Sequence, residues 1–384
     1  IRATLAIADG NPDSDIIVQV EDGHAGGHHS WVNLDDLLLT TYAEIRARKN
    51  VVLAIGGGIG TPEKAAYYLT GQWSEDLGYP KMPVDGIIVG TAAMATKEAT
   101  TSPQVKQALV DTPGVDPQDA GGWVGRGQTR GGVTSGLSHL HADMYELDND
   151  SAAASRLISS IDSDDVEEHR EELIAAINKT AKPYFGDLEE MTYAEWIERW
   201  VDLAYPSQDP TWDDRLFDLV HRLEARLNDA DHGEIETLFP DLDSIADAPA
   251  AIEKLLATYP QAREIKVSAR DAAWFIGLNR KHHKPMPWVP AIDADLARWW
   301  GLDTLWQAHN ERYDANSVRV IPGPVSVAGI DRVDEPVADL LGRFEEACVE
   351  AVDGEPVEIY ARLNEAKTER ELLLSAPHIV WHGN

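Results

Sequence analysis

Three short apolar runs recur early in the chain, and each is followed by a glycine-rich turn and a helical pattern. The runs are Ile16–Val20, Val51–Ile55 and Val84–Val89. Each leads to a helix with a suitable N-cap residue, which is Asn33, Thr61 or Ser102. Strands that alternate with helices of this size form a parallel sheet, and ligands bind at the carboxyl ends of its strands. The sequence therefore predicts an α/β fold with its functional loops along one edge of a parallel sheet.

The turn after the first run contains the string EDGHAGGHHSW, in which glycines free the backbone and three imidazoles share one loop. Histidine exchanges protons near neutral pH, so His28 and His29 are candidate catalytic residues. Solvated histidines in an ordinary glycine-rich loop are the alternative. A metal site is not predicted, because glycines between His24 and His28 disfavour the helix that would align them, and no Cys or carboxylate pattern completes a ligand set.

The turns after the second and third runs suit a phosphate group. The glycines of Gly56–Gly60 precede a helix start, where backbone N–H groups and the helix dipole favour an anion. Gly90-Thr91 adds a second small donor site and a hydroxyl. Neighbouring strand ends of this kind form the phosphate cradle of many barrel enzymes. Ordinary tight turns between strand and helix are the alternative.

Four further regions follow along the chain. They are a loop or lid insertion (114–163), a helical region (164–246), a small α+β region (247–352), and a linker into a next region (353–384). Strands are expected at Glu264–Val267, Val318–Ile321 and His378–Trp381, and a helix at Glu335–Val352. Several tryptophans recur within helix patterns and are interpreted as packing residues: Trp196, Trp200, Trp212, Trp299 and Trp300.

Charge and composition exclude several classes of function. The formal net charge is −33, from 33 Lys and Arg against 66 Asp and Glu, which disfavours nucleic acid and anionic membranes as partners. The single cysteine, Cys348, rules out an internal disulfide. There is no apolar run long enough to cross a bilayer and no signal-peptide pattern. We therefore expect a cytoplasmic protein.

The three turns together resemble the carboxyl half of the FMN-dependent barrel flavoproteins, which include nitronate monooxygenases and flavin-type enoyl reductases. Longer strings are similar to the enoyl reductase region of bacterial and fungal type I fatty acid synthases, with the bacterial single-chain form nearest. These strings are GHAGGHHSW, AIGGGIGTPEKAA, MPVDGIIVGTAAMATKEATTS, KTAKPYFGD, DTLWQAH and IPGPVSVAGI.

The resemblance implies a partial FMN-binding barrel over residues 1–113. The residues expected to contact FMN are Gly57, Gly58, Gly90 and Thr91 at its phosphate, and Gly26 and Gly27 at its ring. His28 matches the family's Gly-Gly-His histidine beside the flavin, and His29 is the second choice. The implied reaction passes hydride from NADPH or NADH through FMN to a trans-2-enoyl thioester on an acyl carrier protein. A histidine would donate a hydrogen bond to the developing enolate or a proton to its α-carbon.

The implied fold is the carboxyl-terminal part of a TIM-type (β/α)8 barrel, with about three β/α units, followed by a mainly helical region and a small α+β region. The remaining strands are expected upstream and a dehydratase region downstream, in a large homo-oligomeric synthase whose other domains are partners. Two alternatives remain open. One is a nitronate monooxygenase-type flavin oxidase, and the other is a non-catalytic structural connector of the synthase.

Overall fold

The computed structural model describes residues 1–116, 123–138, 140–207, 209, 211–228, 235–282, 286–301 and 305–352. The chain divides into two compact units. The first contains 1–152, 308–315 and the residues from 319 onward, and the second contains 153–307 and 316–318. The predicted linker at 353–384, with its strand at His378–Trp381, lies outside the described residues.

The first unit contains a three-stranded parallel sheet in the order β1-β3-β4. Its strands are β1 (Ile16–Glu21), β3 (Val51–Gly56) and β4 (Gly86–Ile87). All six residues of β3 are buried, as the apolar sequence of a central parallel strand requires. The three predicted strands are confirmed, the third in a shortened form. The closed barrel that would contain them stays a prediction.

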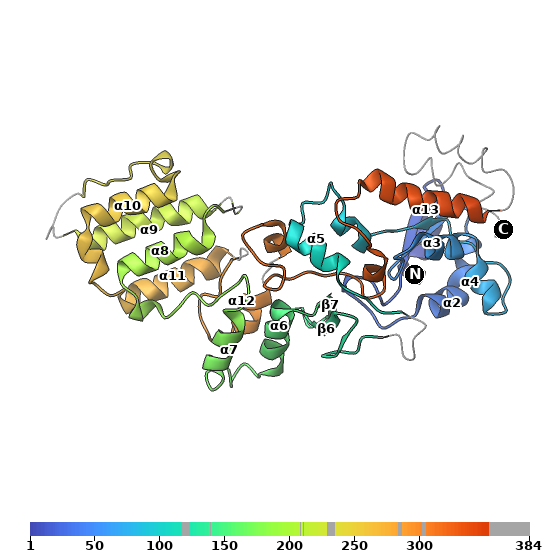
Figure 1. Ribbon diagram of the computed structural model, residues 1–384, viewed down its shortest axis with the longest axis horizontal. Helices are drawn as coiled ribbons and strands as arrows, with labels where there is room; N and C mark the ends of the chain where they lie inside the picture. Colours follow the sequence, from blue (N-terminus) through green and yellow to red (C-terminus); the bar gives the residue numbers. More distant parts are fainter. Residues whose placement is uncertain are drawn as a thin grey trace. The chain divides into compact units, whose positions relative to one another are not determined.

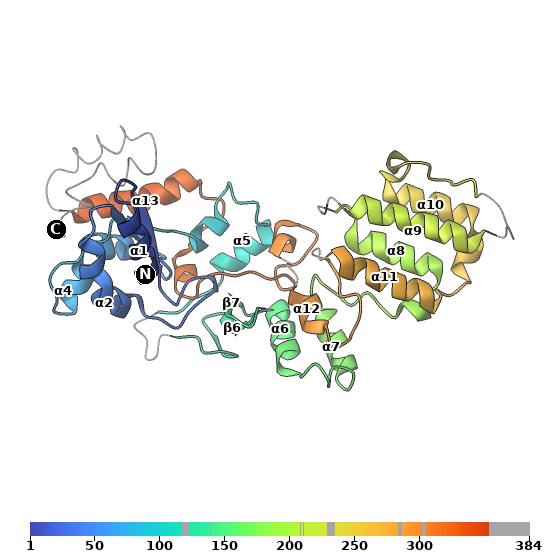
Figure 2. The ribbon, with the colours of Figure 1, turned by 180° about the vertical axis from the view of Figure 1, so that it is seen from behind.

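Helices lie before, between and after these strands along the chain. They are α1 (Arg2–Gly10), α2 (Leu34–Arg46), α3 (Pro62–Leu69), α4 (Gln72–Asp76), η1 (Thr91–Ala95), α5 (Pro103–Val110), η6 (Ser326–Gly329) and α13 (Val337–Ala351). The helix predicted at Glu335–Val352 is confirmed as α13, which packs against α3 although the two are far apart in sequence (Figures 1 and 2).

The predicted N-caps are confirmed, and they fix where each loop ends. The cap side chains accept hydrogen bonds from backbone amides, Asn33 from Asp36 at 3.1 Å, Thr61 from Lys64 at 3.3 Å and Ser102 from Val105 at 3.4 Å. Each bond satisfies an amide that the helix itself leaves without a partner. The predicted site residues therefore lie between a strand end and a capped helix or short 3-10 turn.

A second, antiparallel sheet in the first unit has the strand order β2-β7-β6-β5. Its strands are β2 (Gly27–His28), β5 (Thr129–Arg130), β6 (Val133–Leu137) and β7 (Asp143–Leu147). The sequence predicted a loop or lid insertion here and did not predict these strands; a lid role for the insertion stays a prediction. The sequence of β6 shows no alternation of apolar and polar residues, because the strand buries the small polar side chains of Thr134 and Ser135.

The second unit is helical around one tryptophan-rich core. Its helices are α7 (Arg170–Ile177), η2 (Leu188–Glu190), α8 (Tyr193–Ala204), α9 (Trp212–Leu227), η3 (Leu242–Ile245), α10 (Ala248–Thr258), η4 (Pro260–Arg263), α11 (Ala269–His282) and α12 (Leu296–Gly301). Figures 1 and 2 both show α8, α9, α10 and α11 side by side. The five tryptophans interpreted as packing residues are all buried, which confirms that prediction. Along the chain, two of the unit boundaries fall within α6 (Asp150–Ser160) and η5 (Leu305–His309), and two more lie after residues 315 and 318.

Two predicted strands are absent from the described structure. At Glu264–Val267 the chain instead leaves η4 and makes a single bridge, between Lys266 and Thr192. At Val318–Ile321 it forms no ladder, although the amide of Leu147 donates to the carbonyl oxygen of Val320 at 2.9 Å. Apolar runs of this length are ambiguous from sequence alone. Among the described helices, none combines the length and the apolar character needed to cross a bilayer.

Candidate functional site

Asp22 fixes both ends of the histidine loop. Its amide donates to the carbonyl oxygen of Gly56 at 2.9 Å, which ties the end of β1 to β3. Its buried carboxylate accepts the amide of His24 at 2.7 Å, the ring Nδ1 of His24, and the amide of Leu34 at 2.8 Å. One side chain thus holds the start of the loop and the first residue of α2. Asp22 was not predicted from the sequence, although a carboxylate at a strand end two residues before a histidine is a signal for such a role.

His28 lies at the edge of the antiparallel sheet, on a strand of only two residues. β2 pairs with β7, with Gly27 opposite Tyr145 and His28 opposite Met144. Gly27 has a φ of +71°, a conformation that favours glycine, and is buried, whereas His28 is exposed. The loop therefore presents the imidazole of His28 where a ligand can reach it.

His29 is held in place by a stacked aromatic ring and by hydrogen-bond partners at both ring nitrogens. It stacks on Tyr145 with ring centroids 3.6 Å apart and an angle of 6° between the planes. Its Nδ1 lies 2.8 Å from the carbonyl oxygen of Ser30, to which it can only donate, and its Nε2 lies 3.0 Å from the Ser135 hydroxyl. Burial lowers the pKa of His29, and the Ser30 hydrogen bond and the Asp143 charge only partly oppose this.

The predicted phosphate-binding residues lie at the ends of the neighbouring strands β3 and β4. Gly57 and Gly58 have φ values of +77° and +72°, and a Cβ on Gly57 would lie 2.7 Å from the carbonyl oxygen of Asp22. Gly90 faces open space, with no heavy atom within 4 Å of an added Cβ. Across the described residues, no protein acceptor is found for the amide N–H groups of Gly57, Gly58, Gly90 and Thr91. This arrangement fits an FMN phosphate, since such amides can donate to an anion.

A segment distant in sequence, residues 321–329, lies against all three loops. The amide of Gly323 donates to Thr91 Oγ1 at 3.0 Å. A Cβ on Gly26 would lie 2.6 Å from the carbonyl oxygen of Ile321, and one on Gly60 would lie 2.8 Å from the Cα of Ser326. Protein backbone is therefore what excludes a side chain at Gly26, and the contact of Gly26 and Gly27 with a flavin ring stays a prediction. The string IPGPVSVAGI marked this segment without assigning it a role.

Aromatic side chains surround the histidine loop. His24 stacks on Trp123 at 4.1 Å between ring centroids, and Trp31 meets His29 edge-on at 4.7 Å. The indole Nε1 of Trp31 donates to Asp143 Oδ2 at 2.9 Å. Neither Trp31 nor Trp123 was assigned a role from the sequence.

Asp143 also binds an exposed arginine. Its carboxylate accepts from Arg126 Nε at 2.7 Å and from Arg126 Nη2 at 3.1 Å. These hydrogen bonds, opposed by burial and aided by the one from Trp31, lower the pKa of Asp143. A carboxylate that stays charged at neutral pH therefore fixes both the Trp31 indole and the Arg126 guanidinium.

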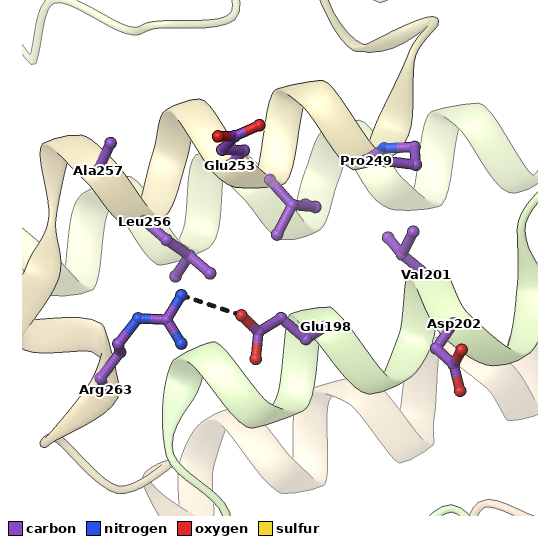
Figure 3. A pocket seen from close by; sticks show the side chains of 9 residues that line it. Glu198, Val201, Asp202, Pro249, Glu253, Leu256, Ala257 and Arg263 are labelled. Carbon is purple, nitrogen blue, oxygen red and sulfur yellow. Dashed lines mark ion pairs between the residues drawn. The ribbon is translucent and has the colours of Figure 1, made fainter.

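The second unit has an open groove of about 570 Å³ between α8 and α10 (Figure 3). Its lining consists of aliphatic side chains, carboxylates and Arg263, which pairs with Glu198 at 3.1 Å. This lining contains no histidine, hydroxyl or glycine turn. The candidate site is therefore the histidine loop and the two glycine turns of the first unit.

The part of the chain that contains this site matches a known protein family. A family model described as "Fatty acid synthase subunit beta/Fas1-like, helical" matches residues 15–341. The matched range contains the histidine loop, both glycine turns, and the helices of the second unit. The chain belongs to this family. The predicted membership of the fatty acid synthases is therefore confirmed.

Individual relatives agree with the family match. The fatty acid synthase subunit beta of Gibberella zeae is 33% identical over an alignment that covers 92% of the chain. The fatty acid synthase beta subunit aflB of Emericella nidulans and the fatty acid synthase subunit beta of Schizosaccharomyces pombe are each 31% identical, over 92% and 91% of the chain. The chain spans 18% of the length of each of these relatives. Its assignment to a bacterial single-chain form and to an enoyl reductase stays a prediction.

Proposed function

We propose that this chain supplies part of the FMN site of an enoyl reductase in a type I fatty acid synthase of the bacterial single-chain form. The observation that carries the proposal is the set of uncommitted amides at the ends of β3 and β4, beside a loop that exposes His28. Membership of the synthase family supports the same context. The substrate would be an enoyl thioester on an acyl carrier protein, and other domains of a homo-oligomeric cytoplasmic synthase would be its partners.

The glycine turns would hold the cofactor's phosphate, and the amides of Gly57, Gly58, Gly90 and Thr91 would donate to it. A bound FMN would supply hydride transfer from NADPH or NADH to the β-carbon of the enoyl thioester. Gly26 and Gly27 would line the ring without adding a side chain. The 321–329 segment would hold the Thr91 turn in place through the hydrogen bond from Gly323.

The two histidines would have different roles. His28 is exposed, so its imidazole can reach the thioester oxygen as a hydrogen-bond donor or the α-carbon as a proton donor. His29 is less suited to donate a proton, because its lowered pKa leaves less of the protonated ring at neutral pH and its Nδ1 proton is engaged by Ser30. Its packing on Tyr145 supports a part in orienting the loop that carries His28.

Gly90 allows cofactor binding to be tested separately from folding. An added methyl group at Gly90 meets no protein atom, so Gly90→Ala should fold normally. If the turn binds phosphate, the methyl group should weaken FMN binding about tenfold or more. Flavin absorbance and FMN titration are measured on the chain extended at its amino end by the expected upstream strands. Gly10→Ala, another glycine with open space around it, is the matched control. Unchanged FMN affinity in Gly90→Ala, or an extended polypeptide without flavin, would refute the proposal.

His28→Ala should keep FMN and lose enoyl reduction by about 100-fold, since a positioned proton donor typically contributes 10²–10⁴ in rate. The assay follows bleaching of the flavin by NADPH or NADH and its reoxidation by a crotonyl thioester. His169→Ala is the control, because His169 is exposed and lies in the second unit. Full activity in His28→Ala would show that this histidine takes no part in the reaction. Rapid oxidation of alkyl nitronates with no enoyl reduction would favour the nitronate monooxygenase alternative.

A further inference from the structure

We propose that Trp31 and Arg126 form a binding site for the nicotinamide dinucleotide, with a planar ring of the ligand stacked on the indole and a phosphate paired with the guanidinium. The proposal deepens the proposed function and rests on it, because that function requires a dinucleotide but assigns no residue to bind it. The two side chains are held side by side by one carboxylate, that of Asp143.

Trp31 has the properties of a stacking surface. The residue is 42% exposed, although large aromatic side chains are normally covered. Its indole is nevertheless fixed, by the hydrogen bond to Asp143 and by edge-on contacts with His29 and Trp123. An exposed ring that is already oriented loses little conformational entropy when a ligand ring stacks on it.

Arg126 supplies the cationic group beside this surface. Its side chain is 57% exposed, and Asp143 engages its Nε and one Nη2 proton. A guanidinium has five N–H donors, so its outer edge can still donate to a phosphate. Because Asp143 offsets the charge, phosphate alone would bind weakly. The ligand must also stack, which favours a dinucleotide over a free phosphate or a phosphopantetheine arm, which has no planar ring.

The position of this surface fits a hydride donor. The carbonyl oxygen of Asp143 accepts the amide of His29 at 3.0 Å, and the next residue, Met144, pairs with His28. The dinucleotide would thus lie beside the proposed catalytic histidine. The FMN phosphate would lie elsewhere, on the turns after β3 and β4. The two ligands therefore have separate sets of anion-binding groups.

The test measures NADPH and NADH binding by dinucleotide fluorescence, in the chain itself and in the extended polypeptide. Trp31→Leu should weaken binding about tenfold, the size expected for one stacked ring. Arg126→Gln should weaken it about fivefold at low salt and less at high salt. Trp31→Phe keeps a stacking ring and should lose less than Trp31→Leu. The controls are Tyr79→Leu, an exposed aromatic residue, and Arg332→Gln, an exposed arginine paired with Asp331 at 2.7 Å.

Flavin content and the thermal midpoint of each variant separate this proposal from the previous one. If the polypeptide lacks flavin but dinucleotide binding depends on Trp31, the flavin proposal fails and the dinucleotide site stands. Dinucleotide affinity unchanged in both Trp31→Leu and Arg126→Gln would overturn the site. So would an equal loss in the controls, or no detectable dinucleotide binding by either polypeptide.

Discussion

Among single residues, Asp22 has the largest expected effect on the candidate site. Asp22→Ala removes the acceptor for two buried amides and for the His24 ring, and leaving such donors unsatisfied should cost about 3 kcal/mol of unfolding free energy. Urea denaturation of the first unit measures this loss. Asp9→Ala removes an exposed carboxylate that pairs with Arg48, and should change stability little. Equal effects of the two substitutions would show that the loop does not depend on Asp22.

In the second unit, the buried carboxylate of Asp271 joins three helices. It accepts hydrogen bonds from Tyr193, Arg222, Arg226 and Ser268. Burial raises the pKa of Asp271, but these hydrogen bonds outweigh burial and hold the pKa well below its usual value. The pKa of an aspartate in the unfolded chain is about 3.9. The stabilisation is therefore complete above about pH 4 and is lost as the pH falls below that value toward the folded-state pKa.

Asp271→Asn should accordingly destabilise the second unit by about 3 kcal/mol at neutral pH and make its stability less dependent on pH below about 4. Urea midpoints followed by tryptophan fluorescence at about pH 7 and pH 3 give both quantities. Glu190→Gln removes an exposed carboxylate paired with Lys266 and should cost at most about 1 kcal/mol. A pH dependence in Asp271→Asn as steep as in the unsubstituted chain would contradict this explanation.

Among helices and strands, the sequence predicted those features that depend only on residues close together in the chain. Caps at Asn33, Thr61 and Ser102 and the fully apolar β3 need only neighbouring residues, and each was found where expected. The antiparallel sheet was missed because Thr134 and Ser135 become buried only through pairing with β7. The place of the 321–329 segment depends on contacts with loops more than two hundred residues away, and no local pattern encodes them.

The contact between the 321–329 segment and the histidine loop can be tested at Gly26. Gly26→Ala places a methyl group 2.6 Å from the carbonyl oxygen of Ile321, so backbone must move at an expected cost of about 2 kcal/mol. Gly10→Ala is the matched control, since nothing lies within 4 Å of its added methyl group. Thermal midpoints of the two variants measure the difference. A Gly26→Ala chain as stable as the control would mean that the segment is free to move away.

At the scale of the whole molecule, the chain contains two cores of different origin. The core of the first unit surrounds the parallel strand β3, whereas that of the second unit is a continuous cluster of aromatic and aliphatic side chains from its helices. The second core contains all five tryptophans predicted to pack. The candidate site draws only on residues of the first unit. The helical unit has its own core and contributes no residue to that site. This is the part for which the connector alternative remains a reasonable proposal.

We expect the two units to unfold in separate transitions, because residues unfold cooperatively only with the residues that share their packed core. Calorimetry of the chain should show two heat-absorption peaks. Asp22→Ala should lower the temperature of one peak and Asp271→Asn that of the other. In the double variant each peak should shift by the amount seen in its own single variant, since the two substitutions lie in different units and do not interact. Gly10→Ala and Glu190→Gln serve as controls for the first and second unit. A single peak that both substitutions lower would mean that the two units unfold as one cooperative structure.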